Sequence, residues 1–359
     1  MTATATTQNI LLADLHISLS SPLVRCLFAR AITGCATLEE DRFLPPNFEA
    51  YFGYYRAQCQ EAICDGPDSS KSHQDIVELA QHLAKLLSTE PTVVSNHDDY
   101  VYWKNFTVRV LTMIDVGELR QGIKTGPSPR TWSAGSLNDF MKQTFEPRVL
   151  SDNKRLEKLF NARNITRIAE INIRWTCNLA DHLRLEDEDT AVQVFSHASF
   201  LELHQNSWVF YRPDHYEANS SLRDIFPSNF ITETLQTLAL LFPSDDKKVA
   251  TWFRKEQKRF PISWFIDPHA MNLPCLAKKD HHTENFEFWH DRLVLLKQAF
   301  DEANPKSMQQ LWIDRRQMAQ WAYFWYAIIL VVGVTVFFGL VQSVIGAMQV
   351  YKAYHPTSA

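Results

Sequence analysis

The chain has 359 residues, of which 45% are hydrophobic, 12% aromatic and 21% charged, a composition that excludes disordered and fibrous classes. This length allows one large domain or two of average size. The formal net charge of −5 provides no bulk attraction for nucleic acid, so we expect no nucleic-acid partner.

The first third of the chain predicts helices and one strand. The opening MTATATTQNILLADLHISLS lacks the basic and long apolar regions of a secretory signal. Pro45 and Pro46 set a turn before an aromatic-rich helix capped near Asn47. The segment QDIVELAQHLAKLLS predicts an amphipathic helix, because its leucines share one face. YVYWKNFTVRVLTMI at 100–114 is rich in β-branched and aromatic residues, which favours a strand.

The middle of the chain has the clearest β pattern. Residues 168–197 alternate in character, and the acidic run from Glu186 to Asp189 suits a turn between antiparallel strands. A helix between Pro227 and Pro243, capped near Ser228, follows. The next helical stripe must pack against another helix and consists of Phe286, Trp289, Leu293, Leu296 and Phe300. We therefore predict an α+β fold: a mostly helical cytosolic domain over residues 1–320, of one or two subdomains, with a small antiparallel β element.

An uncharged segment predicts one transmembrane helix near the carboxyl end. Residues 317–351 contain no Asp, Glu, Lys, Arg or His, whereas roughly 20 apolar residues suffice to cross a bilayer. We assign the transmembrane helix to 321–351 and a short tail to 352–359. Amphipathic rings prefer the headgroup level, so Trp321, Trp325, Tyr351 and Tyr354 are expected as interface anchors.

The charges beside this helix predict its orientation. Arg315 and Arg316 precede it, whereas only Lys352 follows it. Positive charges favour the cytosolic side, so the large amino-terminal domain is expected to face the cytosol. Such a protein inserts after translation, as tail-anchored proteins do; the residues do not indicate which membrane.

Small residues form a stripe along the predicted span. Thr335, Gly339, Ser343 and Ala347 recur every four residues, and Gln342 lies beside them. This spacing lets two helices approach closely and predicts a homo-oligomer through the span. The alternative is that Gly and Ser are simply common in transmembrane helices.

Two other groups of residues suggest binding chemistry. His182, His197 and His204 would bind zinc if they converged, but their spacing matches no metal motif, and half-buried or surface histidines are the simpler interpretation. His281, His282 and His290 form a second cluster, for which we favour surface loop histidines. The basic run from Lys247 to Arg259 would touch anionic lipid headgroups if helical; a solvated face with its aromatic residues inward is the favoured alternative.

The sequence predicts neither an enzyme nor a bound cofactor. It has no GxSxG, no phosphate-binding glycine loop, no CxxC pair and no kinase motifs, and glycine is scarce at 10 residues. The six cysteines are widely spaced, so we expect reduced and mostly buried thiols.

Five stretches carry a resemblance to a known group of proteins: FLPPNFEAYF, INIRWTCNLADHLRL, FSHASFL, ETLQTLALLFP and the end LWIDRRQMAQWAYFWYAIILVVGVTVFFGLVQSVIGAMQVYKAYHP. Together they resemble a family of uncharacterised single-span integral membrane proteins of filamentous ascomycete fungi, a domain of unknown function. The carboxyl end also resembles fungal CorA-like proteins. CorA channels, however, have two spans and a Gly-Met-Asn signature, and here Met271 and Asn272 follow Ala270 far from the single span.

These observations predict a membrane-anchored interaction or scaffold protein of a fungus. The resemblance implies an accessory gene-cluster product that affects hyphal surface or colony traits. A degenerate CorA-like ion transporter subunit is one alternative, and a metal-dependent enzyme using the three central histidines is another. The sequence alone does not identify a partner or substrate.

Overall fold

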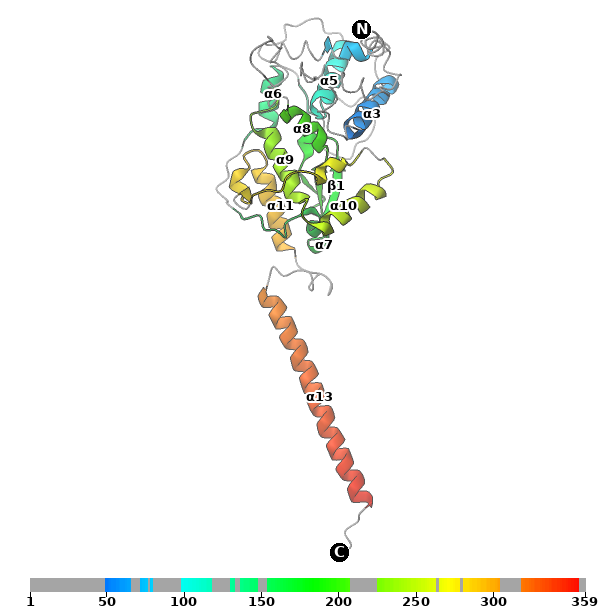
Figure 1. The fold of residues 1–359 in the computed structure, drawn as a ribbon, viewed down its shortest axis with the longest axis vertical. Helices are drawn as coiled ribbons and strands as arrows, with labels where there is room; N and C mark the ends of the chain where they lie inside the picture. Colours follow the sequence, from blue (N-terminus) through cyan, green and yellow to red (C-terminus); the bar gives the residue numbers. More distant parts are fainter. Residues whose placement is uncertain are drawn as a thin grey trace. The chain divides into compact units, whose positions relative to one another are not determined.

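The computed structural model describes residues 49–65, 72–76, 78–79, 98–117, 130–132, 136–147, 154–206, 225–262, 265–277, 280–303 and 318–354. The chain divides into two compact units, residues 1–302 (unit 1) and 303–359 (unit 2). Unit 1 is mostly helical with one small sheet, and unit 2 contains one long apolar helix (Figure 1). This arrangement confirms the predicted α+β class.

Helices make up most of the part of unit 1 that the structure describes. The α-helices are α3 (Glu49–Asp65), α5 (Asp98–Thr112), α6 (Leu137–Thr144), α7 (Ala162–Ile168), α8 (Ala198–Asn206), α9 (Phe230–Leu241), α10 (Lys247–Arg259) and α11 (His290–Glu302). The 3₁₀ helices within the described residues are η1 (Leu179–Asp181), η3 (Pro268–Met271) and η5 (Thr283–Asn285). Helices α3, α5 and α6 lie toward one end of unit 1, and α7, α10 and the carboxyl end of α11 lie toward the other (Figure 1).

The sheet has three strands in the order β1-β3-β2, with bounds β1 (Asn172–Thr176), β2 (Leu185–Glu186) and β3 (Ala191–Phe195). β2 and β3 form the predicted antiparallel hairpin, but β1 pairs with β3 in parallel, so the prediction of a wholly antiparallel element is wrong. Alternation indicates strands without indicating their partners. The chain reverses direction twice, once through η1 between β1 and β2 and once in the turn between β2 and β3, so β1 and β3 run in the same direction. Central β3 is buried on both faces, as expected for a covered strand.

Residues 100–114 are not a strand, which corrects the sequence prediction. Most of the segment lies in α5, whose buried side chains include Trp103, Phe106, Thr107, Val110 and Leu111. This spacing is that of one helix face, and it outweighs the local β propensity. Thr107 Oγ1 donates to the Trp103 carbonyl at 2.8 Å, a bond that suits threonine within a helix.

Tyrosines of α3 complete the end of α5. Tyr51 Oη donates to the Val110 carbonyl at 3.1 Å, and Tyr54 Oη donates to the Arg109 carbonyl at 3.3 Å. The last carbonyls of a helix have no intrahelical partner, so Tyr51 satisfies a Val110 group that would otherwise be costly to bury, whereas the Arg109 carbonyl also accepts from the Met113 N–H at 2.8 Å. The predicted aromatic-rich helix after Asn47 is thus confirmed as α3, and its aromatic residues belong to the core.

An aromatic cluster joins α9 and α11 in the core. Phe230 lies 4.1 Å from Phe145 and 5.6 Å from Trp289, measured between ring centroids. All five residues of the predicted stripe from Phe286 to Phe300 are buried, although the helix itself begins only at His290. Helix α9 ends before Pro243 as predicted, and its N-cap is Asn229, next to the predicted Ser228, without a hydrogen bond from the cap side chain.

Two further predictions have mixed outcomes. The amphipathic helix in QDIVELAQHLAKLLS falls mostly outside the described residues. The four described cysteines are free thiols, but Cys64 and Cys275 are exposed, so the expectation of mostly buried thiols is wrong for them. Cys59 is buried and Cys177 is half-buried.

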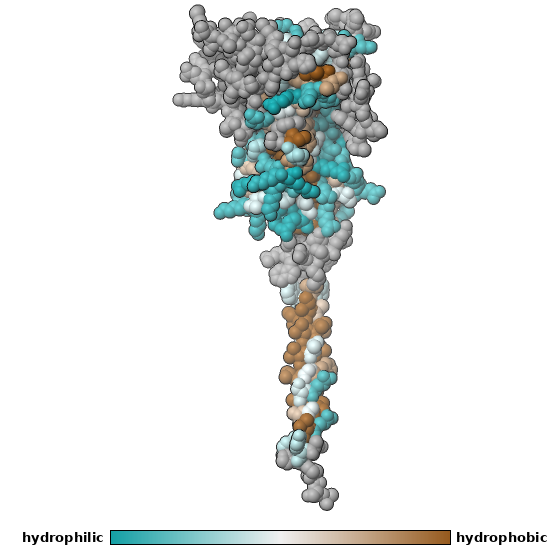
Figure 2. Space-filling view, turned by 90° about the vertical axis from the view of Figure 1, so that its right-hand side faces the viewer, coloured by the Kyte–Doolittle hydropathy of each residue, from teal (hydrophilic) through white to brown (hydrophobic). Residues whose placement is uncertain are grey.

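Unit 2 contains α13 (Met318–Tyr354). Within it, the 30 residues Ala322–Tyr351 are long and apolar enough to cross a membrane; an 18-residue stretch of them has a mean hydropathy of 2.6, and none of that stretch is buried. Figure 2 shows the hydrophobic colour along much of this helix, with polar side chains gathered on one face of its carboxyl half. The single apolar helix that the sequence predicts is therefore present.

Candidate functional site

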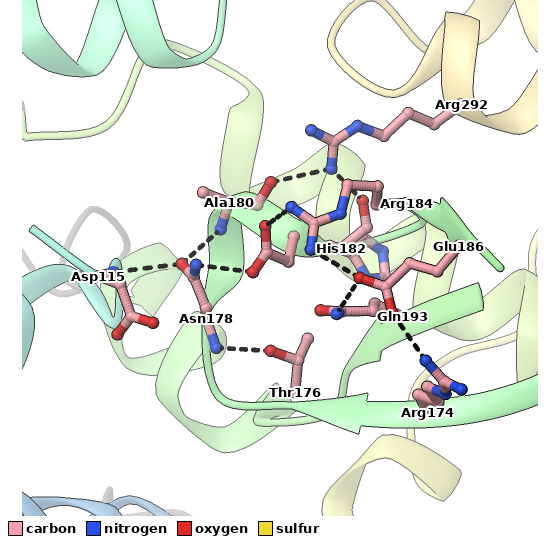
Figure 3. Close-up of polar contacts among 11 residues, drawn as sticks. Asp115, Arg174, Thr176, Asn178, Ala180, His182, Arg184, Glu186, Gln193 and Arg292 are labelled. Atoms are coloured by element: carbon pink, nitrogen blue, oxygen red, sulfur yellow. Dashed lines mark hydrogen bonds and ion pairs between the residues drawn. The ribbon is translucent and has the colours of Figure 1, made fainter. Parts of the chain in front are cut away.

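A polar network surrounds the turn that follows β1 (Figure 3). The backbone N–H of Asn178 donates to Thr176 Oγ1 at 3.0 Å, and Asn178 Oδ1 accepts from the N–H groups of Ala180 and Asp115, both at 3.2 Å. Its Nδ2 donates to Asp181 at 2.8 Å. Asn178 therefore caps η1 and connects it to the segment that follows α5. We call these residues, with those bonded to them below, the turn network.

Arg184 connects this turn to the hairpin. Its guanidinium donates to Asp181 Oδ1 at 2.5 Å and to Glu186 Oε1 at 2.8 Å. Gln193 Nε2 donates to the same Glu186 oxygen at 2.6 Å, and Arg174 donates to the other at 3.2 Å. Both oxygens of the Glu186 carboxylate therefore have partners from different strands. These bonds fix η1, β1, β2 and β3 relative to one another.

Arg292 connects α11 to the same turn. Its Nη1 donates to the carbonyl of Ala180 at 2.9 Å and to that of His182 at 2.5 Å (Figure 3). Charge-assisted bonds to carbonyls are stronger than neutral ones. The turn is thus held from both sides, by the sheet and by a helix that is more than 100 residues later in the chain.

Charges of opposite sign lie close together in and around the turn network, where Arg130 is a further cation near Asp181. Burial raises the pKa of Asp181, and the nearby Arg184 and the bond from Asn178 oppose that rise. Burial lowers the pKa of Arg130, and Asp181 opposes that change. The side chains of Asp181 and Glu186 are only 15% and 17% exposed, so their ion pairs are better shielded from solvent than surface pairs.

The arrangement of the turn network supports a structural role: it positions the turn after β1 relative to the sheet. The carboxylates of Asp181 and Glu186 already accept from arginine and amide donors, and Asn178 uses both side-chain atoms. Satisfied networks of this kind stiffen a structure and specify one conformation. The turn network therefore holds a rigid connection at the sheet, and sequence analysis indicated only its acidic turn.

His182 is a buried member of the same region, with both ring nitrogens bonded. Its Nδ1 accepts from the Phe195 N–H at 3.2 Å, so its Nε2 carries the proton and donates to Thr237 Oγ1 at 2.7 Å. The Thr237 hydroxyl in turn donates to the Thr234 carbonyl at 2.6 Å. Burial, with a smaller effect of Arg292, lowers the pKa of His182 to about 3. The ring is neutral and joins the sheet to α9.

His197 and His204 lie in separate environments. His197 Nε2 is 3.5 Å from Cys177 Sγ, and burial lowers the pKa of His197 to about 3. His204 packs edge-on against Phe200, and burial lowers its pKa to about 4. All three histidines are buried, so the expectation of half-buried or surface positions is wrong.

A metal centre is not apparent in the described part of unit 1. Among the residues that the structure describes, no group of three or more His, Cys, Asp and Glu is placed to hold a metal ion. His182, His197 and His204 thus do not converge there. In the second histidine cluster, His281 and His282 are half-buried, and His290 is buried at the start of α11, so the surface interpretation is wrong for His290.

Two buried carboxylates that sequence analysis missed accept hydrogen bonds from backbone N–H groups at or just before the starts of helices. Asp267 accepts from Ser199 Oγ at 2.6 Å, from the Ser199 N–H at 2.8 Å and from the His269 N–H at 2.9 Å. Burial raises the pKa of Asp267. His269 also lies 2.7 Å from Glu202, which raises the pKa of His269. The sequence does contain an indication of this cap, because Asp267 followed by Pro268 is a typical helix start.

Glu233 is the second of these carboxylates. It accepts from three consecutive backbone N–H groups, of Glu287, Phe288 and Trp289, each at 2.8 Å. These three residues directly precede α11, so their N–H groups lie outside the helix and Glu233 supplies acceptors for them. Burial raises the pKa of Glu233 to about 7, although the three bonds oppose that rise. No local pattern indicates this contact, since the partners are more than 50 residues apart.

The predicted residues of the span lie on α13. Thr335 Oγ1 donates to the Val331 carbonyl at 2.8 Å and Ser343 Oγ donates to the Gly339 carbonyl at 2.9 Å, so both hydroxyls bond within the helix. Gln342 and Ala347 are exposed beside them, and the oligomer through this stripe stays a prediction.

The predicted interface anchors lie near the ends of the same helix. Trp325 is half-buried, and Tyr351 and Tyr354 are exposed. Trp321 lies in α13 with its side chain outside the described structure, and Arg315 and Arg316 lie outside the described residues.

Comparison of the chain with models of known protein families gives no match, and comparisons with curated proteins and with solved structures give none either. The interpretation therefore depends on the geometry of the chain itself.

Proposed function

We propose that the chain is a single-span membrane protein in which Ala322–Tyr351 crosses a bilayer and unit 1 acts as a cytosolic interaction or scaffold domain. One observation carries the proposal: this 30-residue apolar helix has none of its length buried. A core helix of a soluble protein would be covered by the chain around it.

The dimensions and energetics of the helix support a membrane environment. At 1.5 Å per residue, 30 residues extend about 45 Å, more than the hydrocarbon thickness of roughly 30 Å. Burying one large aliphatic side chain contributes about 1.5–3 kcal/mol, so leaving the whole helix in water would forgo on the order of tens of kcal/mol. Lipid is the medium that buries such a surface on all sides at once.

The flanking charges support the cytosolic orientation of unit 1. Arg315 and Arg316 lie shortly before the span, whereas Lys352 is the one cation in the residues that follow. Short positively charged segments remain on the cytosolic side during insertion.

The polar groups of unit 1 support a role in interaction. The carboxylates of Asp181, Glu186, Glu233 and Asp267 bond to donors of the chain itself. Such groups hold a rigid framework, and a rigid framework on a membrane presents its outer surface to partners.

Glycosylation tests the orientation. The chain contains Asn-x-Ser/Thr sequences at Asn105, Asn164 and Asn219, and a further acceptor sequence can be appended after Ala359. Expressed in eukaryotic cells, the chain should acquire a glycan only on the appended sequence, and protease added to sealed membranes should digest unit 1. A glycan on Asn105 or Asn219 would place unit 1 in the lumen and overturn the proposal.

A further inference from the structure

Helix α10 separates charged and apolar side chains sharply. Its cations all have exposed side chains and are Lys247, Lys248, Arg254, Lys255, Lys258 and Arg259. At 3.6 residues per turn these six fall within roughly 140° of the helix circumference. Val249 and Phe253 point the other way and are fully buried in the core. We call the six cations the basic face.

The basic face has little internal neutralisation. Among the described residues, Arg259 pairs with Glu256 at 3.9 Å, and no ion pair involves the other five. Nearby acids have other partners: Asp246 caps α10 through the N–H groups of Lys248 and Val249, and Asp245 pairs with Lys158. A chain with a net charge of −5 thus concentrates six uncompensated or weakly compensated cations on one helix.

Apolar and basic groups extend this surface. Ile262, which follows α10, is 45% exposed. Helix α7, which packs against α10, carries the exposed Arg167. In the view of Figure 2, which faces the side of unit 1 where α10 lies in Figure 1, hydrophilic side chains gather over much of the described surface. A cationic helix face of this kind is attracted to anionic lipid headgroups, even though the apolar face of α10 is buried in the core.

The basic face lies near the point where the chain leaves unit 1. Phe160, beside α7, contacts Phe300 in the last turns of α11, with ring centroids 5.5 Å apart. The chain therefore leaves α11 next to α7, which in turn packs on α10 (Figure 1). Only residues 303–321 separate Glu302 from the span, so the exit is at most about 65–70 Å of extended chain from the bilayer.

We propose that the basic face of α10 docks on anionic headgroups of the membrane that holds the span, which orients unit 1 on that surface. This inference rests on the proposed anchor. Each cation near an anionic membrane adds attraction that weakens with salt, and tethering removes most of the entropic cost of finding the surface. The solvated-face alternative that the sequence favoured predicts the same helix but no lipid dependence.

Lysine acylation of the full chain in nanodiscs tests this proposal. One nanodisc contains phosphatidylcholine alone, and the other also contains phosphatidylserine; mass spectrometry gives the acylation rate of each lysine. With phosphatidylserine, the acylation rates of Lys255 and Lys258 should fall at least about threefold, and high salt should restore them. Lys104 on α5, at the other end of unit 1, is half-buried and serves as the internal reference in every variant.

A pair of matched variants separates docking from a general effect of surface charge. Lys255→Gln/Lys258→Gln should remove the lipid-dependent protection of Lys247 and Lys248, whereas Arg56→Gln/Lys142→Gln, with the same charge change on exposed positions of α3 and α6, should keep it. Equal rates in both nanodiscs, or protection only by an added polyanion such as RNA, would overturn the proposal. Failure of the chain to enter either nanodisc would instead count against the anchor.

Discussion

Unit 1 and α13 treat their apolar side chains in opposite ways. In unit 1, large residues such as Phe106, Phe195 and Trp289 are at most 1% exposed, and their partners are other parts of the same chain. Along α13, Leu330, Phe337 and Leu340 are each about 60% exposed or more, at 64%, 62% and 63%. Unit 1 buries its apolar side chains against its own residues, whereas the apolar side chains of α13 need an apolar environment outside the chain.

Polar groups show the same contrast. In unit 1 some hydroxyls, such as that of Thr107, bond within their own helix, but other polar groups bond over long stretches of sequence, as Glu233 does with the N–H groups before α11 and Asn178 with Asp115. On α13, the described hydroxyls of Thr335 and Ser343 bond to carbonyls four residues earlier. A helix that satisfies its polar groups locally is suited to lipid, where no water is available for them.

Charges placed in the middle of the span should give the largest effect. Val334→Asp/Val341→Asp should cost about 5–7 kcal/mol of insertion free energy, at about 2.5–3.5 kcal/mol for each carboxylate. The double variant should leave membranes on alkaline extraction, while Val334→Leu/Val341→Leu should remain. Retention of the aspartate variant would show that the helix is held by something other than lipid.

Loss of the central tryptophan should have the next largest effect. Trp289 is 1% exposed, contacts Phe230 and donates from Nε1 to Thr234 at 2.9 Å. Trp289→Ala should lower the free energy of unfolding of unit 1 by about 3–5 kcal/mol, measured by urea titration of the full chain in nanodiscs.

A matched control for this change lies on the same region of the chain. Leu295 of α11 is 56% exposed, so Leu295→Ala should change the free energy of unfolding by only about 0.5 kcal/mol. Similar losses for the two variants would contradict the assignment of α11 to the core.

Acid should destabilise unit 1 through its buried histidines. The folded pKa values of His182 and His197 are about 3 and that of His204 about 4, below the ordinary value of 6.5. The unfolded chain therefore binds more protons below pH 6.5, and stability falls as the pH decreases toward the folded values. Each histidine should lower the free energy of unfolding by roughly 2 kcal/mol between pH 7 and pH 5.

A single variant isolates one histidine from opposing groups. Glu233 acts in the other direction, because its pKa is raised to about 7 and its protonation favours the folded state between pH 7 and 4.5. His182→Gln keeps a donor for Thr237 and should reduce the pH 7 to pH 5 loss by roughly 2 kcal/mol. An unchanged loss in this variant would show that His182 is not buried in its neutral form.

The smallest of these effects should come from the turn network. Asn178→Ala removes the acceptor of the Ala180 and Asp115 N–H groups and should cost about 1–2 kcal/mol of unfolding free energy. Lys158→Ala, which removes a surface pair with Asp245, is the control and should cost less than about 0.5 kcal/mol. Equal effects in urea titration would contradict a structural role of the network.

Local sequence patterns predict the elements of this fold that depend on a short segment of the chain and not on one particular distant contact. Apolar content predicts α13, proline boundaries predict α9, and alternation predicts the β2–β3 hairpin, because each signal depends on a short segment. Helix α5 was not predicted, since its β-branched residues favour a strand until the tyrosines of α3 and the core are considered.

The candidate site was less accessible to sequence reasoning. The acidic turn was visible, but Arg292 reaches the turn network from more than 100 residues away, and no spacing rule connects them. The histidines were visible as residue types, but their burial and neutral state depend on Thr237, Phe195 and the surrounding core. The parallel pairing of β1 likewise depends on a long-range choice of partner.

Thiol labelling from the two sides of a membrane tests the central claim most directly. Cys64 and Cys275 are exposed in unit 1, and Tyr354→Cys adds a thiol at the far end of α13. In sealed vesicles with the cytosolic face outward, a membrane-impermeant maleimide should label Cys64 and Cys275 at once and the thiol at position 354 only after detergent is added. Immediate labelling at all three positions would show that the helix does not cross the bilayer.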